Sequence, residues 1–186
     1  MAVVNPTKHL TDIDEWHKMG AAGVFSENNH IELIDGEILD MAPIGFNHAG
    51  HLNRINKLFT ILVADYADTS VQNPLQLSDF SEPEPDFMLL KPNADFYCTR
   101  HPNADDVLLL IEVSDTTLNY DQNKKLHLYA RHNIPEYWIL NLNDNCLEVY
   151  RKPRGEVYGE KTTLQAGDNI VLSQLPHINI NVAAIL

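Results

Sequence analysis

The chain contains few of the residues that build disulfide or zinc frameworks. Cys98 and Cys146 are its two cysteines among 186 residues, and no CxxC spacing occurs. A disulfide framework and a cysteine-based structural zinc site are therefore excluded. No apolar run approaches the roughly 20 residues that a membrane helix needs, and residues 1–14 lack the basic and apolar segments of a signal peptide. We expect a cytoplasmic protein that does not enter a membrane.

Basic residues are also scarce. Lysine and arginine number 13 against 26 aspartates and glutamates, which gives a net charge of −13. This balance disfavours tight, non-specific nucleic-acid binding, because such binding depends on neutralising phosphates with Lys and Arg. It does not exclude a nuclease, since clustered acids that hold divalent cations add to the negative count. The basic cluster at residues 151–154, or assembly into a homodimer, would have to guide a nucleic acid in.

Repeats, low-complexity tracts and Ser/Gly-rich linkers are absent, so residues 1–186 are predicted to form a single domain. Apolar periodicity and turn residues predict the following elements in order: a helix at 11–22, a hairpin at 31–41, an amphipathic helix at 47–65, strands at 71–77, 86–90 and 107–113, a helix at 118–131, strands at 136–140 and 146–150, and short strands after 155. This order indicates a mixed α/β (α+β) fold built around one sheet.

Three charged residues stand where their neighbours are expected to be buried. Asp86 follows Pro85 and opens the apolar run 87–90, and Glu112 lies near the end of the apolar run 107–113. Lys125 lies on the apolar side of the helix that follows. An isolated buried charge is costly unless it is paired, neutralised or bound to metal. The three residues are therefore a site hypothesis.

Simple geometry brings these residues together. If strands 86–90 and 107–113 pair antiparallel, Asp86 and Glu112 become cross-strand neighbours, and Ser114 points to the same face as Glu112. At about 100° per residue, Lys125 falls inside the apolar arc of its helix, whereas Lys124 falls at the solvent edge. An i,i+4 pair between Asp121 and Lys125 is also natural.

Phosphodiester hydrolysis is the chemistry that suits this set best. It needs a hard cation such as Mg²⁺ or Mn²⁺, for which Asp86 and Glu112 offer oxygen ligands. It also needs a positive group near the developing charge. A partly buried Lys125 can orient or deprotonate the attacking water, because desolvation lowers the pKa of a lysine.

Ordinary structural roles remain open for each residue. Asp86 could terminate a turn after Pro85, Glu112 could pair with a nearby cation at a strand end, and Lys125 could extend its amine to solvent. His48 and His51 lie one turn apart, a spacing that suits a metal ion but also a helix-cap or core-edge pair. An aromatic such as Tyr129 in the second long helix is commonly a core residue with a hydrogen-bonded hydroxyl.

Several spaced segments, in order, resemble the Uma-two family of the PD-(D/E)XK restriction-endonuclease-like superfamily. They are Ile31–Glu37, His48, Glu84–Phe87, Ile111–Ser114, Asp121–Tyr129 and Pro135–Trp138, and the apolar ending Leu175–Leu186 is also similar. The resemblance implies a restriction-endonuclease-like core, a central mixed sheet flanked by helices, with an N-terminal hairpin and extra C-terminal strands.

The same resemblance implies roles for individual residues. Asp86 and Glu112 would be catalytic acids that bind the metal, and Glu32 would be a supporting N-terminal acid, although a hairpin strand often carries an outward glutamate. Ser114 stands where the lysine of the ExK pattern would be, which makes Lys125 the catalytic substitute.

Three functions from different classes fit these observations. The first is a Mg²⁺- or Mn²⁺-dependent endonuclease that acts on DNA through Glu32, Asp86, Glu112 and Lys125. The second is a catalytically inactive interaction or assembly module on the same fold, which the acidic balance favours. The third is a metal-dependent phosphoesterase for small nucleotides, for which the charge of −13 matters less.

Overall fold

The computed structural model describes residues 7–26 and 30–186 of the chain, and these fall into two compact units. The first unit comprises the described residues within Met1–Pro43 and Gln76–Pro83, and the second comprises Ile44–Leu75 and Glu84–Leu186. The single domain over residues 1–186 stays a prediction.

The first unit holds a capped helix and a hairpin. Helix α1 (Ile13–Ala21) begins after Asp12, whose side chain accepts from the Glu15 backbone while the Glu15 side chain bonds back to Asp12, the reciprocal pattern of a capping box. Strands β1 (Ile31–Ile34) and β2 (Glu37–Asp40) pair antiparallel. Asp35 and Gly36 join them at φ of 54° and 74°, the left-handed pair that a tight hairpin turn requires.

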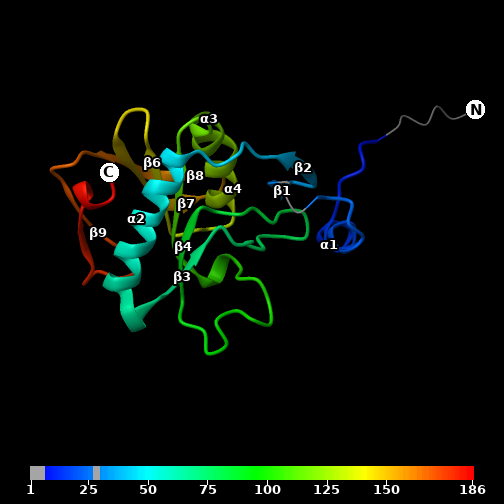
Figure 1. Ribbon diagram of the computed structural model, residues 1–186, viewed down its shortest axis with the longest axis horizontal. Helices are drawn as coiled ribbons and strands as arrows, with labels where there is room; N and C mark the ends of the chain where they lie inside the picture. The colour runs from blue at the N-terminus through cyan, green and yellow to red at the C-terminus, as the bar shows by residue number, and fades with distance from the viewer. Residues whose placement is uncertain (1–6, 27–29) are drawn as a thin grey trace, which may run out of the picture. The chain divides into compact units, whose positions relative to one another are not determined.

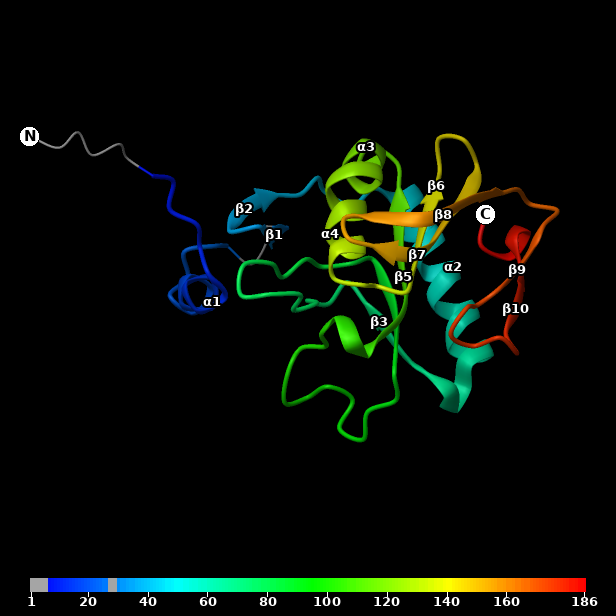
Figure 2. The ribbon, with the colours of Figure 1, turned by 180° about the vertical axis from the view of Figure 1, so that it is seen from behind.

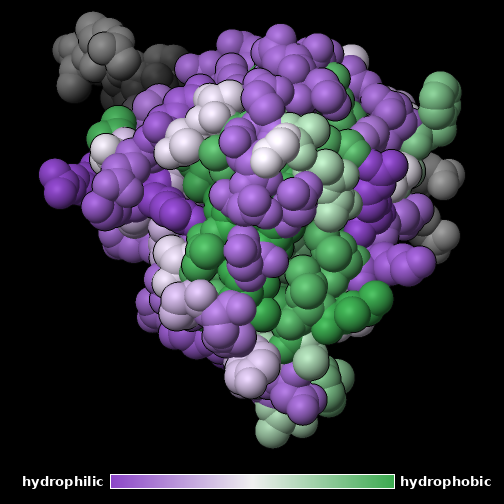
Figure 3. Space-filling view, turned by 90° about the vertical axis from the view of Figure 1, so that its left-hand side faces the viewer, coloured by the Kyte–Doolittle hydropathy of each residue, from purple (hydrophilic) through white to green (hydrophobic). Residues whose placement is uncertain are grey.

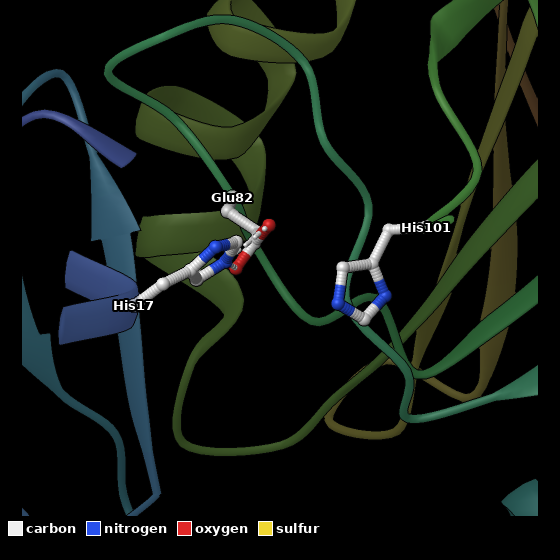
Figure 4. Close-up of side chains that lie close together, drawn as sticks. All are labelled: His17, Glu82 and His101. Atoms are coloured by element: carbon white, nitrogen blue, oxygen red, sulfur yellow. Dashed lines mark hydrogen bonds and ion pairs between the residues drawn. The ribbon is translucent and has the colours of Figure 1, made fainter. Parts of the chain in front are cut away.

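A buried carboxylate ties residues 76–83 to α1 within this unit. Glu82 is 4% exposed and accepts from Trp16 Nε1 at 3.1 Å, while His17 Nε2 lies 2.9 Å from the same oxygen (Figure 4). The backbone N–H of Glu82 donates to the Leu33 carbonyl in β1. Helix, hairpin and the 76–83 segment therefore share one point of attachment.

The second unit is organised around a six-stranded mixed sheet. Its strands lie in the order β3 (Asp68–Val71), β4 (Phe87–Leu90), β5 (Val107–Ser114), β6 (Glu136–Asn141), β7 (Cys146–Arg154) and β8 (Val157–Leu164). Only β5 and β6 pair parallel within this sheet, and the other neighbours are antiparallel. A helical segment connects β5 to β6, as a parallel crossover requires.

One face of the sheet carries the main apolar core. Helix α2 (Phe46–Val63) lies across this face, and Phe59 packs against both Phe87 and Trp138. The C-terminal hairpin of β9 (Asn169–Val171) and β10 (Asn179–Asn181) lies on the same side as α2, with α3 (Leu118–Tyr120) and α4 (Leu126–Arg131) across the sheet (Figures 1 and 2). Apolar residues from α2, four strands (β4 to β7) and the C-terminal segment form one buried cluster.

The opposite face is covered by the crossover between β5 and β6. It consists of α3 (Leu118–Tyr120), a π-helical turn (Asp121–Lys125) and α4 (Leu126–Arg131). The expectation of one regular α-helix over 118–131 was therefore wrong in its centre. Hydrogen-bond spacing of i to i+5 widens the helix there, and both Asp121 and Lys125 are buried at 3% exposure. Amino-acid propensities do not encode this widening.

The expected strand at 71–77 was misplaced. The observed strand β3 ends at Val71, because Gln72 adopts a left-handed backbone with φ of 49°. The remaining core strands, the helices expected at 11–22 and 47–65, and the hairpin agree with their expected positions to within a few residues.

The surface over α2 and the C-terminal segment is rich in apolar side chains (Figure 3). Exposed members of these elements include Ile61 at 70% and Val171 at 42%, and Tyr66, at 59%, ends the 3-10 turn (Ala64–Tyr66) that follows α2. Apolar surface of this kind is common at protein contacts, and the homodimer stays a prediction. In the described residues, no helix is both long and apolar enough to cross a membrane.

A second buried carboxylate links β7 to its surroundings. Glu148 accepts from Gln122, Asn141 and Tyr150, and lies 2.7 Å from Lys161 Nζ in β8. Burial alone would raise the pKa of Glu148, but the hydrogen bonds from Lys161, Tyr150 and Asn141 lower it below its ordinary value. This ionised carboxylate stabilises the fold.

Glu148→Gln should therefore destabilise the protein in a pH-dependent manner. A lowered folded-state pKa gives stability that is present above the unfolded pKa and lost as pH falls through the folded value. We expect a cost of about 1–3 kcal/mol at pH 7 and a smaller cost at pH 4, measured by urea unfolding. Glu160→Gln, at an exposed strand position, is the matched control. An equal cost at both pH values would contradict this assignment.

Candidate metal and phosphodiester site

The register of β4 and β5 places two acids side by side. Phe87 pairs with Ile111, so Asp86 and Glu112 are opposite one another at the next position. The backbone N–H of Asp86 donates to Glu112 Oε2 at 3.2 Å, and the N–H of Val113 donates to Asp86 Oδ2 at 2.8 Å. The antiparallel pairing expected from the sequence is thus observed, and it joins the two carboxylates through the backbone.

Glu112 is the centre of a buried polar cluster. Its side chain is enclosed in the sheet, and its Oε1 accepts from Lys125 Nζ at 2.9 Å and from the Tyr129 hydroxyl at 2.8 Å. Lys125 is 3% exposed, so its amine does not extend to bulk water. A buried ion pair of this kind is tolerated when further hydrogen bonds complete it, as Tyr129 and Asp86 do here.

The beginning of α2 supplies a histidine to Asp86. His48 Nε2 lies 2.9 Å from Asp86 Oδ1, whereas His51 Nδ1 bonds the Asn47 carbonyl of its own helix. The two histidines therefore have different partners. Burial alone would lower the pKa of His48, but the hydrogen bond with Asp86 and the charges of Asp86 and Asp121 raise it.

A third acid, Asp121, is bound by two hydroxyl groups near the end of β5. Asp121 accepts from Ser114 Oγ and from Thr117 Oγ1, both at 2.7 Å. Burial raises the pKa of Asp121, while Lys125 and the two hydroxyls oppose this shift. Ser114, which occupies the ExK lysine position, thus binds the first residue of the π-helical turn whose last residue is Lys125.

Four of the residues discussed from the sequence meet in the second unit, namely Asp86, Glu112, Lys125 and Tyr129. Glu32 is buried at 2% in β1 of the first unit, and its catalytic role stays a prediction. Sequence reasoning gave His48 no partner and paired Asp121 with Lys125 alone. A histidine at a helix start, and hydroxyls four and seven residues before Asp121, were the available signals.

The side chains present fit a divalent cation. The ammonium of Lys125 bonds Glu112, and its charge opposes the rise in the pKa of Asp121 that burial causes. The charge of Asp86 contributes to the raised pKa values of both His48 and Asp121, so this carboxylate adds negative charge to the surroundings of both groups. Carboxylate oxygens are the ligands that Mg²⁺ and Mn²⁺ prefer, and Asp86 and Glu112 are adjacent on the strands.

The sheet, the hairpins and the helices define a fold class that a solved structure shares. A crystal structure described as "a putative nuclease belonging to DUF820" from Anabaena variabilis is similar, with a TM-score of 0.70 and 14% sequence identity. The similarity covers 94% of this chain and 96% of that chain. At this identity the match establishes the fold, and it confirms the expected mixed sheet with flanking helices, an N-terminal hairpin and C-terminal strands.

Within that class the chain belongs to the Uma2 family, whose description is "Putative restriction endonuclease". The family profile matches residues 13–183, which is nearly the whole chain. This confirms the resemblance drawn from the spaced segments. No protein in the curated set matches the chain.

The pair of Lys125 and Glu112 can be tested through stability in metal-free buffer. Lys125→Met leaves the carboxylate of Glu112 buried without its cation, which should cost about 3–5 kcal/mol of unfolding free energy. The double variant Glu112→Gln/Lys125→Met should cost less than the two single changes summed. Lys124→Met is the control and should fall within about 0.5 kcal/mol of wild type. A Lys125→Met protein as stable as the control would show that the two groups do not interact in solution.

Proposed function

We propose that the protein is a Mg²⁺- or Mn²⁺-dependent endonuclease that hydrolyses phosphodiester bonds in DNA. The observation that carries this proposal is the meeting of Asp86, Glu112 and Lys125 at adjacent strands and the helix above them. Membership of the Uma2 family supports the same reaction class. A buried ion pair beside a second acid is costly for a purely structural purpose, which argues against an inactive assembly module.

The proposed roles follow from the contacts. Asp86 and Glu112 would hold the divalent ion, which would supply Lewis-acid polarisation of the phosphate and lower the pKa of an attacking water. Lys125 places a fixed positive charge where negative charge develops on the phosphate oxygens. It can do so without reorganisation, because Glu112 and the surrounding core already fix its position.

The neighbouring groups act on these residues by positioning them. His48 and the Val113 N–H hold the two oxygens of Asp86, so this carboxylate has one preferred orientation. Tyr129 holds Glu112 together with Lys125. Groups that fix an active side chain to within a fraction of an ångström are commonly as important as the side chain itself.

Cleavage of plasmid DNA with added Mn²⁺ or Mg²⁺, and its absence with EDTA, is the direct test. Asp86→Asn, Glu112→Gln and Lys125→Ala should each reduce the rate by about 100-fold or more, as removal of one transition-state contact does. Single-stranded DNA and a nucleotide panel, assayed in parallel, separate the endonuclease from a small-nucleotide phosphoesterase.

Two matched controls accompany these variants. Lys124→Ala removes the neighbouring lysine, and Asp105→Asn removes an exposed acid in the loop between β4 and β5. Both should cleave like wild type. Cleavage that persists in Asp86→Asn and Lys125→Ala, or that falls equally in the controls, would reject the proposed site.

Metal binding should also be visible without catalysis. A ligand at about 100 times its dissociation constant stabilises the folded state by about 2.7 kcal/mol, which for a domain of this size raises Tm by roughly 5–10 °C. We expect Mn²⁺ to raise the Tm of wild type and not that of Asp86→Asn or Glu112→Gln. Equal shifts in all three proteins would place the ion elsewhere.

A further inference from the structure

The second unit contains a cavity away from the acids just described. It has a volume of about 300 Å³ and is lined by residues of β3, the end of β4 and the loop at residues 91–106, among them Asp68, Asn73, Phe96 and Tyr97. Asp86 lies at the opposite end of β4, roughly 13 Å away along the strand at 3.3 Å per residue. The cavity is therefore a separate place on the same sheet.

The wall of this cavity contains an unusual stretch of backbone. Phe96 and Tyr97 are consecutive and both left-handed, with φ of 53° and 61°. Aromatic residues rarely adopt this conformation, because the side chain crowds the backbone. Phe96 also remains 74% exposed, so packing of its ring does not offset the cost. Strain of this kind is concentrated at functional sites.

Side-chain hydrogen bonds hold the loop in this conformation. Asn93 Oδ1 accepts the Asp95 N–H at 3.1 Å, and Asp95 Oδ1 accepts the Tyr97 N–H at 3.0 Å. The Tyr97 hydroxyl donates to the Lys91 carbonyl at 2.7 Å, and the Asn93 N–H donates to Asp68 Oδ2 at 2.9 Å. The loop is thus built to present the Phe96 ring beside β3.

The polar groups of the cavity favour a ligand that donates hydrogen bonds. Asp68 uses one carboxylate oxygen for the loop and has a second oxygen for a ligand N–H. Asn73 donates its amide hydrogens to Ser70 and the Val71 carbonyl, which leaves its amide oxygen as an acceptor. Burial and the nearby charge of Asp106 raise the pKa of Tyr97 to about 12. Arg100, whose guanidinium lies 5.3 Å from the centre of the Tyr97 ring, opposes this shift. The acceptor oxygens of Asp68 and Asn73 therefore carry the preference for a neutral donor over a phosphate.

A planar, neutral group with N–H donors at its edge combines these properties. Nucleobases with an exocyclic amino group have a π-face for Phe96 and an N–H edge for Asp68, and single-strand binding proteins use aromatic side chains in this way. In a duplex the π-face of a base is stacked on its neighbours and its Watson–Crick edge is hydrogen-bonded to the partner base, so neither can contact the cavity. The ligand is therefore an unpaired base.

We propose that the cavity formed by Asp68, Asn73 and the Phe96 ring binds an unpaired, amino-bearing nucleobase. This inference rests on the proposed function for one point, namely that the base belongs to the nucleic acid that is cleaved. The cavity then fixes a base while the acids at the other end of β4 receive a phosphate.

Binding can be measured apart from catalysis, in EDTA and in an Asp86→Ala background. Phe96→Trp retains the aromatic face and reports stacking as fluorescence quenching, with the same background lacking this change as the blank. Adenosine and cytidine should quench it, and thymidine should do so less. A single-stranded oligonucleotide should bind more tightly than a blunt duplex, and this comparison distinguishes a base in a strand from a free nucleoside.

Two variants test the contacts separately. Phe96→Asn suits the left-handed backbone, so the loop should keep its conformation and Tm, while affinity for adenosine and the oligonucleotide should fall at least about fivefold, the low end of the loss for one stacking platform. Asp68→Asn keeps an oxygen for the Asn93 N–H and should weaken adenosine relative to thymidine. Isothermal titration calorimetry gives both affinities.

Each outcome decides one hypothesis. Wild-type affinity in a folded Phe96→Asn protein, or no quenching by any nucleoside or oligonucleotide, would overturn the base site. Base binding by a protein that never cleaves would keep the base site and remove the nuclease. Metal-dependent cleavage without base binding would keep the nuclease and remove the base site.

Discussion

The ion pair between Lys125 and Glu112 is the interaction on which the second unit depends. Both groups are buried, and neither charge is tolerable there without the other. The pair joins β5 to the crossover helix, and the Tyr129 hydroxyl and the Asp86 N–H complete the hydrogen bonding of Glu112. A core of apolar residues alone would allow this helix to shift along the sheet. The ion pair between Lys125 and Glu112 holds the helix at one position on the sheet.

The remaining geometry of the site follows from that position. The ion pair fixes the Lys125 side chain at the end of the π-helical turn. At the start of the same turn, Asp121 accepts hydrogen bonds from Ser114 and Thr117. Both ends of this turn, Asp121 and Lys125, are buried. The resulting excess of acid over base is unfavourable by itself, and a bound cation would offset it.

The sequence was informative wherever one element decides where a side chain points. Antiparallel register predicted that Asp86 meets Glu112, and helical periodicity separated Lys125 from Lys124. It was uninformative where distant elements must meet. His48, in α2, contacts Asp86, which directly precedes β4 and is 38 residues away in the sequence. The strained backbone at Phe96 depends on side chains elsewhere in its loop. The π-helical turn arises from packing, which propensities do not record.

The acidic character of the chain has a consequence for how a nucleic acid would bind. A net charge of −13 repels phosphate at a distance, and three acids do so at the site itself. A divalent ion at Asp86 and Glu112 would reverse the local potential, so metal and substrate should bind with positive coupling. Contacts to a neutral base avoid the repulsion altogether. A nuclease with this charge would gain little non-specific affinity, and under the two proposals its selectivity would depend on the metal and on unpaired bases rather than on the phosphate backbone.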